Sequence, residues 1–457
     1  MVTPSVLDPR LRSLTLGLPL VVTLFAFDNL GVTTVMPRIA RDLDGLRLYG
    51  WAFSAFTLAS MVGLVLAGHH ADRRGPAPSL AAGLGLFVVG LLVTATATDM
   101  AVVVAGRALQ GLGSGSFGTT MYVVIGRAYP AELRSRMFAV LSSAWVLPSL
   151  IGPTLAGVLA DSVGWRPIFI GVAVLAPLPM LLTVPRLRSL GPTVGPSEDR
   201  PSPIGLALAV AAGVGLLLAG LTAPSWTLAL VFGVPGLGLG LVSLGRLLPA
   251  GSWRGRRGIP AAVVLRGVLN VAFFGTDAFI PLFLVRLHHV SAAVAGLPLT
   301  AGGLSWTATS WGMERLRARV GTSASAVIAL LVCSSGVGGI LIALHQRDAL
   351  AVACAAWAVA GMGMGVAYNL VSVAVVDAAT EGREGSTAAA LSLTDALGTS
   401  LGAGVGGALV ALASRVGWSL SGALDVQFAI NLAAGLACLL LGRRLVAEPA
   451  GARATLA

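Results

Sequence analysis

Gly68-His69-His70-Ala71-Asp72-Arg73-Arg74-Gly75 is a short polar sequence between two apolar runs, Trp51–Ala67 and Leu80–Ala97. Runs of about 17 to 25 apolar residues are long enough to cross the hydrocarbon of a bilayer as helices. The polar residues between them therefore predict a tight turn at a membrane surface. On both sides of this turn, similar apolar runs recur along nearly the whole chain.

The composition agrees with a chain that lies in a bilayer. Hydrophobic residues make up 56% of the 457 residues and charged residues only 11%, too few to cover a water-facing surface of ordinary size. A transmembrane β-barrel would show short segments of alternating polarity, and the sequence lacks them. The sequence predicts an all-α integral membrane protein.

The apolar runs number fourteen and predict fourteen transmembrane helices in the order six, two, six. They are Leu16–Met36, Trp51–Ala67, Leu80–Ala97, Met100–Ile125, Phe138–Leu159, Pro167–Val184, Ile204–Leu221, Trp226–Leu244, Ala261–Val285, Val290–Ser310, Ala324–Leu344, Ala349–Val376, Thr387–Ala413 and Leu424–Leu441.

This order predicts three segments. Residues 1–184 form an N-terminal six-helix bundle, and residues 259–457 form a C-terminal six-helix bundle with a short tail. Residues 185–258 hold a proline-rich linker, two extra helices and a basic loop. The extra helices carry no charge between Gly205 and Gly245, so we expect them to face lipid outside the twelve-helix core and the transport pathway.

The basic residues predict the orientation of the chain. All 30 are arginine, and if the N-terminus is cytoplasmic they favour that side by about three to one. Both termini and the Asp72 turn are then cytoplasmic, in a multi-pass protein of the cell membrane whose first span is an anchor rather than a cleaved signal. The net charge of +11 is explained by this topology and by anionic lipid, so no nucleic-acid partner is expected.

Neither cysteines nor histidines indicate a metal site or a cofactor. Cys333, Cys354 and Cys438 are scattered singly in apolar helices, and the five histidines fall at loops or helix ends. We expect no cofactor and no catalytic residues, because an integral-membrane enzyme would need a cluster of catalytic groups at one interface.

The two six-helix blocks resemble each other. Gln110-Gly111-Leu112-Gly113-Ser114-Gly115 lies 250 residues before Ala360-Gly361-Met362-Gly363-Met364-Gly365. An offset of 244 aligns Pro37 with Pro281 and Gly68 with Gly312. Parallel repeats of this kind create a cavity between two halves that rock to expose it alternately; a chance match between glycine-rich helices is the alternative.

Four groups of residues fall in order on the predicted spans. They are Asp28 with Pro37 in the first, Gly68, Asp72, Arg73 and Gly75 after the second, Arg107, Gln110 and Gly111 in the fourth, and Gly152, Pro153 and Gly157 in the fifth. In these motifs the chain resembles the major facilitator superfamily of transporters. Its plan of six, two and six spans resembles the fourteen-helix drug:proton antiporter family in particular.

The match departs from the family pattern in two places. Basic residues usually follow the second glycine of the turn motif, but Pro76-Ala77-Pro78 stands here. The corresponding turn in the second half, Gly312–Arg319, keeps the basic residues without an Asp-Arg-x-Gly core. Both departures leave open how strongly these turns latch the cytoplasmic side.

The resemblance implies a gating role for Gly68, Asp72, Arg73 and Gly75. A cation or a helix N-terminus across the interface would hold Asp72 in the outward-facing state and release it on rearrangement. A solvated turn with no such role is the alternative.

Asp28 and Arg107 are candidates for proton coupling. An ionisable group at the centre of a transmembrane helix costs roughly 2.5 to 3.5 kcal/mol, so each should face a cavity or a partner, and we expect them to face each other. Separating the pair would let the acid take up a proton on one side and release it on the other. A static ion pair is the alternative.

Further candidates lie in both halves. Asp277 and Asp395 are intramembrane acids that would carry a second proton or attract a cationic substrate, unless they are structural. Gly152, Pro153 and Gly157 would bend the fifth helix and seal the interface between the halves. The side chains that could line a substrate cavity, where ordinary packing is the alternative, are Asn29, Gln110, Tyr122, Trp145, Trp357 and Tyr368.

The sequence thus predicts proton-coupled efflux of amphipathic small molecules, either drugs or a natural product. The partners are the substrate, protons and the lipid bilayer, and one chain suffices as a functional monomer. A lipid or glycolipid exporter of the same fold, a proton-coupled importer and, more remotely, an integral-membrane enzyme remain as alternatives.

Overall fold

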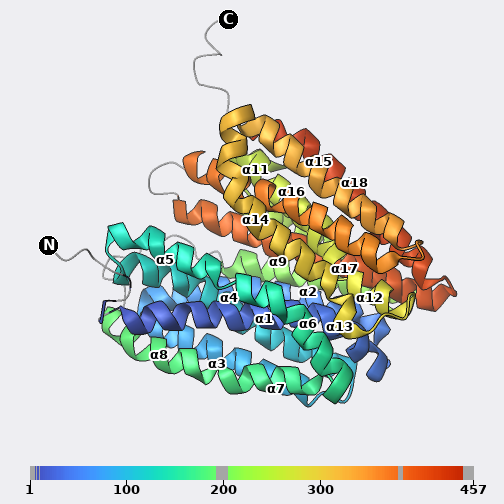
Figure 1. Cartoon of the computed structure of the whole chain (residues 1–457), viewed down its shortest axis with the longest axis horizontal. Coiled ribbons are helices and arrows are strands. Elements are labelled where there is room, and N and C mark those ends of the chain that lie inside the picture. Colours follow the sequence, from blue (N-terminus) through green and yellow to red (C-terminus); the bar gives the residue numbers. More distant parts are fainter. Residues whose placement is uncertain (1–5, 7, 10, 192–203, 379–383, 446–457) are drawn as a thin grey trace, which may run out of the picture.

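The computed structural model describes residues 6, 8–9, 11–191, 204–378 and 384–445, and these residues form a helical structure (Figure 1). The linker residues 192–203 and the tail 446–457 lie outside the described residues. The first group of helices is α1 (Arg12–Asp42), α2 (Tyr49–Arg74), α3 (Pro76–Ala95), α4 (Met100–Ala128), α5 (Ala131–Ser143), α6 (Val146–Val163), α7 (Arg166–Leu175) and α8 (Pro177–Leu187).

Two helices follow, α9 (Ile204–Leu221) and α10 (Trp226–Leu247). The last group is α11 (Ile259–Asp277), α12 (Ile280–Arg286), α13 (Ala292–Ala295), α14 (Leu297–Val320), α15 (Thr322–Ala343), α16 (Ala349–Ala378), α17 (Glu384–Val416) and α18 (Leu420–Gly442). The short 3-10 helices are η1 (Leu46–Leu48), η2 (Arg188–Leu190) and η3 (Ser252–Arg254).

The described residues include eleven segments that are long and apolar enough to cross a membrane. Helices α4, α9 and α14 are not among these eleven segments. Each of the three nevertheless coincides with one of the fourteen predicted runs. The expected all-α membrane architecture is confirmed. The fifth, sixth, ninth and tenth predicted spans, each expected as one helix, are built from two helices apiece.

The fifth span shows why one of these helices is interrupted. Its break lies at Ala144 and Trp145, whereas α6 continues through Pro153, where the sequence predicted a bend. Pro148 has no N–H to donate to the Ala144 carbonyl four residues earlier. Thr23 of α1 donates its hydroxyl to that carbonyl over 3.2 Å, so a side chain from another helix stabilises the break.

The polar sequence after the second span is helical, not a loop. Helix α2 continues through Arg74, so the connection to α3 is the single residue Gly75, which has φ 86° and ψ 168°. A positive φ of this kind favours glycine. Pro76 is the first residue of α3, a position where its missing N–H leaves no helical hydrogen bond unmade.

The same connection occurs in the second group of helices. Gly321 joins α14 to α15 with φ 82° and ψ 166°, nearly the backbone angles of Gly75. The basic sequence Gly312–Arg319 is likewise helical and belongs to α14. Two distant connections with the same conformation support an internal repeat.

Glycines on α4 and α16 provide further support for the repeat. A methyl group at Gly111 of α4 would overlap the Phe56 carbonyl of α2, and one at Gly361 of α16 would overlap the Gly302 carbonyl of α14. These are the positions that the offset of 250 aligns. Each glycine therefore allows its helix to approach the second span of its own group.

Figure 1 shows α1 to α8 gathered on one side and α11 to α18 on the other. The two groups converge toward the end that carries α12 and α13 and diverge toward the end where α1 begins. We call the converged end the closed end. There the Tyr49 hydroxyl of α2 donates to the Ala278 carbonyl, at the break between α11 and α12, over 2.8 Å.

Helices α9 and α10 differ in their surroundings. Buried apolar residues of α9 pack between α2 and α17, in a cluster formed by Leu58, Met61, Val210, Val214, Leu218, Leu393 and Leu397. Helix α10 instead exposes most of its large apolar side chains, including Leu230 and Val231. The expectation that both helices lie outside the core is wrong for α9, which covers the line along which the two groups meet. The lipid contact expected of α10 stays a prediction.

Candidate functional site

Asp28 of α1 and Arg107 of α4 form a buried ion pair. The Arg107 Nη1 donates to Asp28 Oδ2 over 2.8 Å, and each side chain has only 2% of its surface exposed. The predicted pairing is confirmed. An ion pair without access to water needs close geometry and further hydrogen bonds, since both charges have lost their hydration.

Three groups supply those additional contacts to Arg107. Its Nη1 also donates to Gln110 Oε1 over 2.5 Å, and its Nε donates to the Ala52 carbonyl over 3.3 Å. The Phe56 ring lies 4.2 Å from the guanidinium carbon. The Gln110 amide in turn donates to the Thr94 hydroxyl over 3.0 Å, which fixes the acceptor oxygen toward the arginine. Arg107 thus has two neutral acceptors besides Asp28.

A second ion pair joins Asp395 of α17 to Arg266 of α11. Arg266 Nε donates to Asp395 Oδ1 over 2.6 Å and Nη2 donates to Oδ2 over 3.1 Å, a two-pronged geometry that only arginine provides. Arg266 is 5% exposed but Asp395 is 25% exposed. Sequence reasoning named the acid and missed the base, although a lone arginine inside the run Ala261–Val285 is the same signal that drew attention to Arg107.

Polar and aromatic side chains hold this second pair in place. The Tyr368 hydroxyl of α16 donates to Asp395 Oδ2 over 3.1 Å, and Asn270 donates to Oδ1 over 2.5 Å. Arg266 Nη1 donates to the Tyr368 carbonyl over 2.7 Å and to the Ser372 hydroxyl over 3.0 Å. The Arg266 guanidinium also stacks on the Tyr368 ring. Unlike Asp28, the partly exposed Asp395 remains within reach of solvent or a ligand.

Asp277 is the third intramembrane acid and differs from the other two. It is the last residue of α11, beside the helix break near the closed end. The Trp357 indole N–H donates to its Oδ1 over 2.9 Å, but in the described part of the chain Asp277 has no ion pair. A half-buried carboxylate with one neutral donor is a group that a proton or an organic cation would neutralise.

A row of aromatic rings connects Asp277 with the Arg266 and Asp395 pair. Trp357 stacks on Phe273 at a centroid distance of 4.5 Å, and Phe273 meets Trp306 edge-on at 5.5 Å. Trp306 lies 5.2 Å from Tyr368, whose hydroxyl reaches Asp395. The row crosses α16, α11 and α14 and offers rings with a carboxylate at each end.

The side chains that were predicted to line a substrate cavity differ in their exposure. Gln110 and Trp357 are fully buried, so they hold charged groups rather than line open space. Asn29 is exposed beside Asp28, and Trp145 is 49% exposed at the break in the fifth span. Tyr122 lies on α4, but its side chain is outside the described set, as is that of Asp72.

The sequence Gly68–Gly75 lies at the end away from the closed end. Gly68 and Arg73 belong to the last turns of α2, with Arg73 exposed, and Gly75 makes the turn into α3. The three residues of the fifth-helix motif lie on α6. A methyl group at Gly157 would overlap the Ala293 backbone of α13, whereas one at Gly152 would meet its nearest atom, on Phe27, only at 3.6 Å. Of these two glycines, only Gly157 closely approaches the other group of helices, and Pro153 packs against Gly296, the residue before α14.

Within the described residues, no group of three or more histidine, cysteine or acidic residues could hold a metal ion. The intramembrane charges described above are arranged as one ion pair in the first group of helices and, in the second, one ion pair and one separate acid.

Comparison with known proteins identifies the family. Residues 19–403 match the Major Facilitator Superfamily. The chain belongs to the Major Facilitator Superfamily. It is therefore a membrane transporter and not an integral-membrane enzyme.

Two similar proteins carry names that concern drug efflux. A probable multidrug-efflux transporter of Mycobacterium tuberculosis is 30% identical over 435 residues, covering 91% of each chain. A multidrug transporter protein of Bacillus subtilis is 26% identical over 376 residues, covering 79% of this chain and 68% of the relative.

Solved structures share the fold at low identity. A D-xylose–proton symporter has a TM-score of 0.69 and 15% identity, with 96% of this chain and 98% of the symporter covered. A POT family transporter in complex with 5-aminolevulinic acid also has a TM-score of 0.69, at 14% identity, with coverage of 95% and 96%. These likenesses show the fold of the superfamily.

Proposed function

We propose that this transporter exports amphipathic small molecules in exchange for protons. The observation that carries the proposal is the ion pair between Asp28 and Arg107. Charged residues inside a membrane are costly, a buried ion pair adds little stability by itself, and such residues typically mark proton pathways. The names of the similar proteins support drug-like substrates, and the aromatic row supports amphipathic ones.

The proposed exchange of the proton occurs at Asp28. A proton that enters from outside binds the Asp28 carboxylate when Arg107 moves away from it. Gln110 Oε1 and the Ala52 carbonyl then accept the hydrogen bonds of Arg107, so the cation keeps partners while its counter-ion is neutral. When the pair forms again, Arg107 displaces the proton, which leaves on the cytoplasmic side.

Two acids of the second group of helices, Asp395 and Asp277, would also bind protons or charged substrates. We infer that Asp395, which is partly exposed beside Arg266, takes a second proton or the charged group of a substrate. Asp277 would attract a cationic substrate, because it has a carboxylate but no ion pair in the described structure.

The proposed arrangement in the cell membrane has fourteen spans with both termini in the cytoplasm. Residues 1–184 and 259–457 form two pseudo-symmetric bundles around the pathway, and residues 185–258 carry the linker and the two additional helices. The arginine asymmetry supports this orientation. One chain contains both bundles, so the monomer is the proposed functional unit.

With this orientation, the closed end faces outside and the structure corresponds to the inward-facing state. Gly157, against Ala293, would seal the outer end together with Pro153 and Gly152 of the same motif. The sequence from Gly68 through Asp72 and Arg73 to Gly75 would latch the cytoplasmic end when the pathway turns outward.

The test is proton-driven efflux of a dye panel in vesicles with an imposed proton gradient. Asp28→Asn removes the titrating group and keeps the side-chain shape, so gradient-driven efflux should fall to the level of empty vesicles. Substrate counterflow without a gradient should persist, and immunoblotting should show the variant inserted.

Asp99→Asn is the matched control, because Asp99 is an exposed N-cap of α4 that binds the Ala101 and Val102 N–H groups. It should retain gradient-driven efflux. Undiminished proton-driven efflux by Asp28→Asn would remove Asp28 from the coupling mechanism, and net lipid transport with no dye efflux would favour a lipid exporter.

A further inference from the structure

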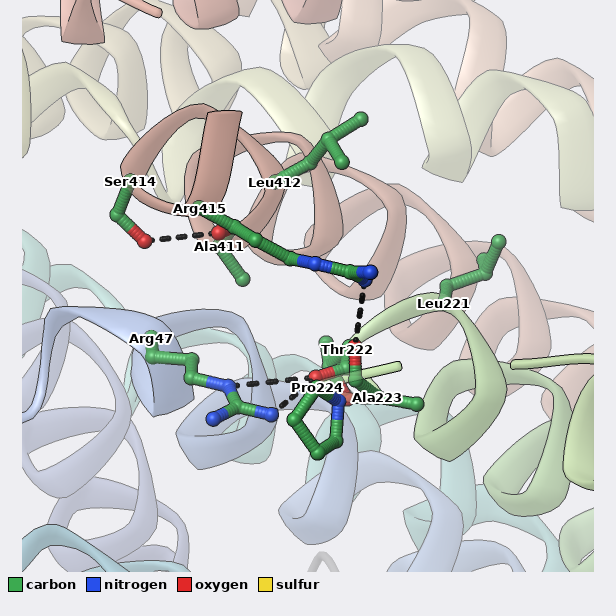
Figure 2. Close-up of a pocket in the computed structure, with 9 residues that line it drawn as sticks. All are labelled: Arg47, Leu221, Thr222, Ala223, Pro224, Ala411, Leu412, Ser414 and Arg415. Atoms are coloured by element: carbon green, nitrogen blue, oxygen red, sulfur yellow. Dashed lines mark hydrogen bonds between the residues drawn. The ribbon is translucent and has the colours of Figure 1, made fainter. Parts of the chain in front are cut away.

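A cavity of about 210 Å³ lies beside the turn between α9 and α10, at the closed end and away from the ion pairs described above (Figure 2). Its lining residues come from η1, the α9–α10 turn and the end of α17. They are Arg47, Leu221, Thr222, Ala223, Pro224, Ala411, Leu412, Ser414 and Arg415.

Two arginines from opposite groups of helices meet at this turn. Arg47 donates from Nε and Nη2 to the Thr222 carbonyl over 3.3 and 2.8 Å. Arg415 donates from Nη1 to the Ala223 carbonyl over 3.1 Å. Figure 2 shows both guanidinium groups directed at the turn. Arg47 precedes α2 and Arg415 ends α17, so one turn links the two groups.

The two charges lack a counter-ion. No acidic residue lines the cavity, and neither Arg47 nor Arg415 has an ion pair in the described part of the chain. Each guanidinium carries five N–H donors, and the backbone carbonyls take only some of them. The spare donors and the double positive charge suit a phosphate group, which arginine binds with two-pronged geometry.

The surroundings of the cavity favour a phosphate that belongs to a lipid. Trp226, the first residue of α10, is 68% exposed, and its ring lies 5.0 Å from the Arg415 guanidinium carbon. Exposed tryptophans at helix ends are typical of the level of the lipid headgroups. Leu230 of α10, one turn further along, is 65% exposed, as expected of a helix surrounded by acyl chains.

We propose that this cavity binds the phosphate group of an anionic phospholipid, with Arg47 and Arg415 as its two ligands. Because the arginines come from opposite groups of helices, the bound phosphate holds those groups together and favours the state that is closed at this end. The lipid therefore regulates the conformational equilibrium without entering the transport pathway.

The experiment measures the thermal unfolding midpoint and, by native mass spectrometry, the lipids retained by the purified full-length protein. Phosphatidylglycerol is compared with phosphatidylcholine and with inorganic phosphate. The test variant is Arg47→Gln with Arg415→Gln. Arg347→Gln is the control, because Arg347 is an exposed arginine between α15 and α16 that does not line the cavity.

Phosphatidylglycerol should raise the midpoint of the wild type and of Arg347→Gln, and the double variant should bind it at least about tenfold more weakly. Arg47→Lys with Arg415→Lys keeps the charge and should retain part of the response, which separates lost binding from misfolding. An equal response to inorganic phosphate would assign the site to a free anion instead. An undiminished phosphatidylglycerol response in the glutamine double variant would overturn the site.

Discussion

Arg107 and Asp28 are separated by 2.8 Å and have only 2% of their side-chain surfaces exposed, so the charge of each is balanced inside the protein. Removing one partner leaves an unbalanced buried charge, which is a larger loss than removing both. We therefore expect Arg107→Ala to lower the free energy of unfolding by about 3 to 5 kcal/mol. The double variant Asp28→Asn with Arg107→Gln should be more stable than either single variant.

Unfolding in detergent micelles, followed by circular dichroism, measures these differences. Arg38→Ala is the control, since Arg38 forms partly exposed ion pairs with Asp42 and Asp161 and should lose only about 0 to 1 kcal/mol. Equal losses for Arg38→Ala and Arg107→Ala would contradict a special cost for the buried pair.

The pair between Arg266 and Asp395 depends on the shape of arginine as well as its charge. Lysine cannot donate to both carboxylate oxygens and to the Tyr368 carbonyl in the same way. Arg266→Lys should therefore reduce efflux about tenfold or more at unchanged expression.

Tyr368→Phe removes only the 3.1 Å hydrogen bond to Asp395 and keeps the ring beneath the guanidinium. It should cost about 1 kcal/mol and leave most of the efflux. Initial rates in vesicles compare the two variants, and a larger defect in Tyr368→Phe than in Arg266→Lys would mean that the hydroxyl, not the ion pair, is the important group.

The sequence predicted the helices and the first ion pair because a bilayer restricts the choices. Each apolar run must be helical, and an isolated charge such as Asp28 must find a partner. Arg266 is an isolated charge of the same kind in the run Ala261–Val285 and likewise needs a partner. The breaks within the spans were harder to predict, because prolines occur both at breaks and inside continuous helices. At Pro148 the break also depends on Thr23 of α1, whose hydroxyl donates to the freed Ala144 carbonyl.

The position of α9 could not be predicted from its residues. Its apolar side chains would suit lipid or a protein groove equally well, and only the tertiary structure places Leu218 between α2 and α17. The turn after α2 was misjudged for a related reason. Polar residues such as His69 and Arg73 indicate where a span reaches water but not whether the helix ends there.

Alanine substitutions at Gly157 and Gly152, two glycines of the same motif, should have different effects on the closed end. A methyl group at Gly157 overlaps the Ala293 backbone, whereas at Gly152 it has its nearest neighbour at 3.6 Å. Gly157→Ala should weaken the contact at the closed end and increase the population that is open there. Gly152→Ala should leave that population unchanged.

The populations are measured by electron paramagnetic resonance between spin labels at the exposed positions Asp44 and Arg347, one on each group of helices at the closed end. The long-distance population should rise in Gly157→Ala only. The same distance distribution in Gly157→Ala and the wild type would exclude this glycine from closure.

Leu218 of α9 tests whether the additional helices belong to the protein interior. It is 1% exposed and its methyl groups pack against Gly404 of α17. Leu218→Ala should therefore leave a cavity and lower the free energy of unfolding by about 2 to 5 kcal/mol. Leu230→Ala on α10 removes the same atoms from a side chain that is 65% exposed, so its effect should stay within about 0.5 kcal/mol. Thermal unfolding of both variants in the same detergent decides the question, because a loss at Leu218 as small as that at Leu230 would mean that α9 is exposed as α10 is.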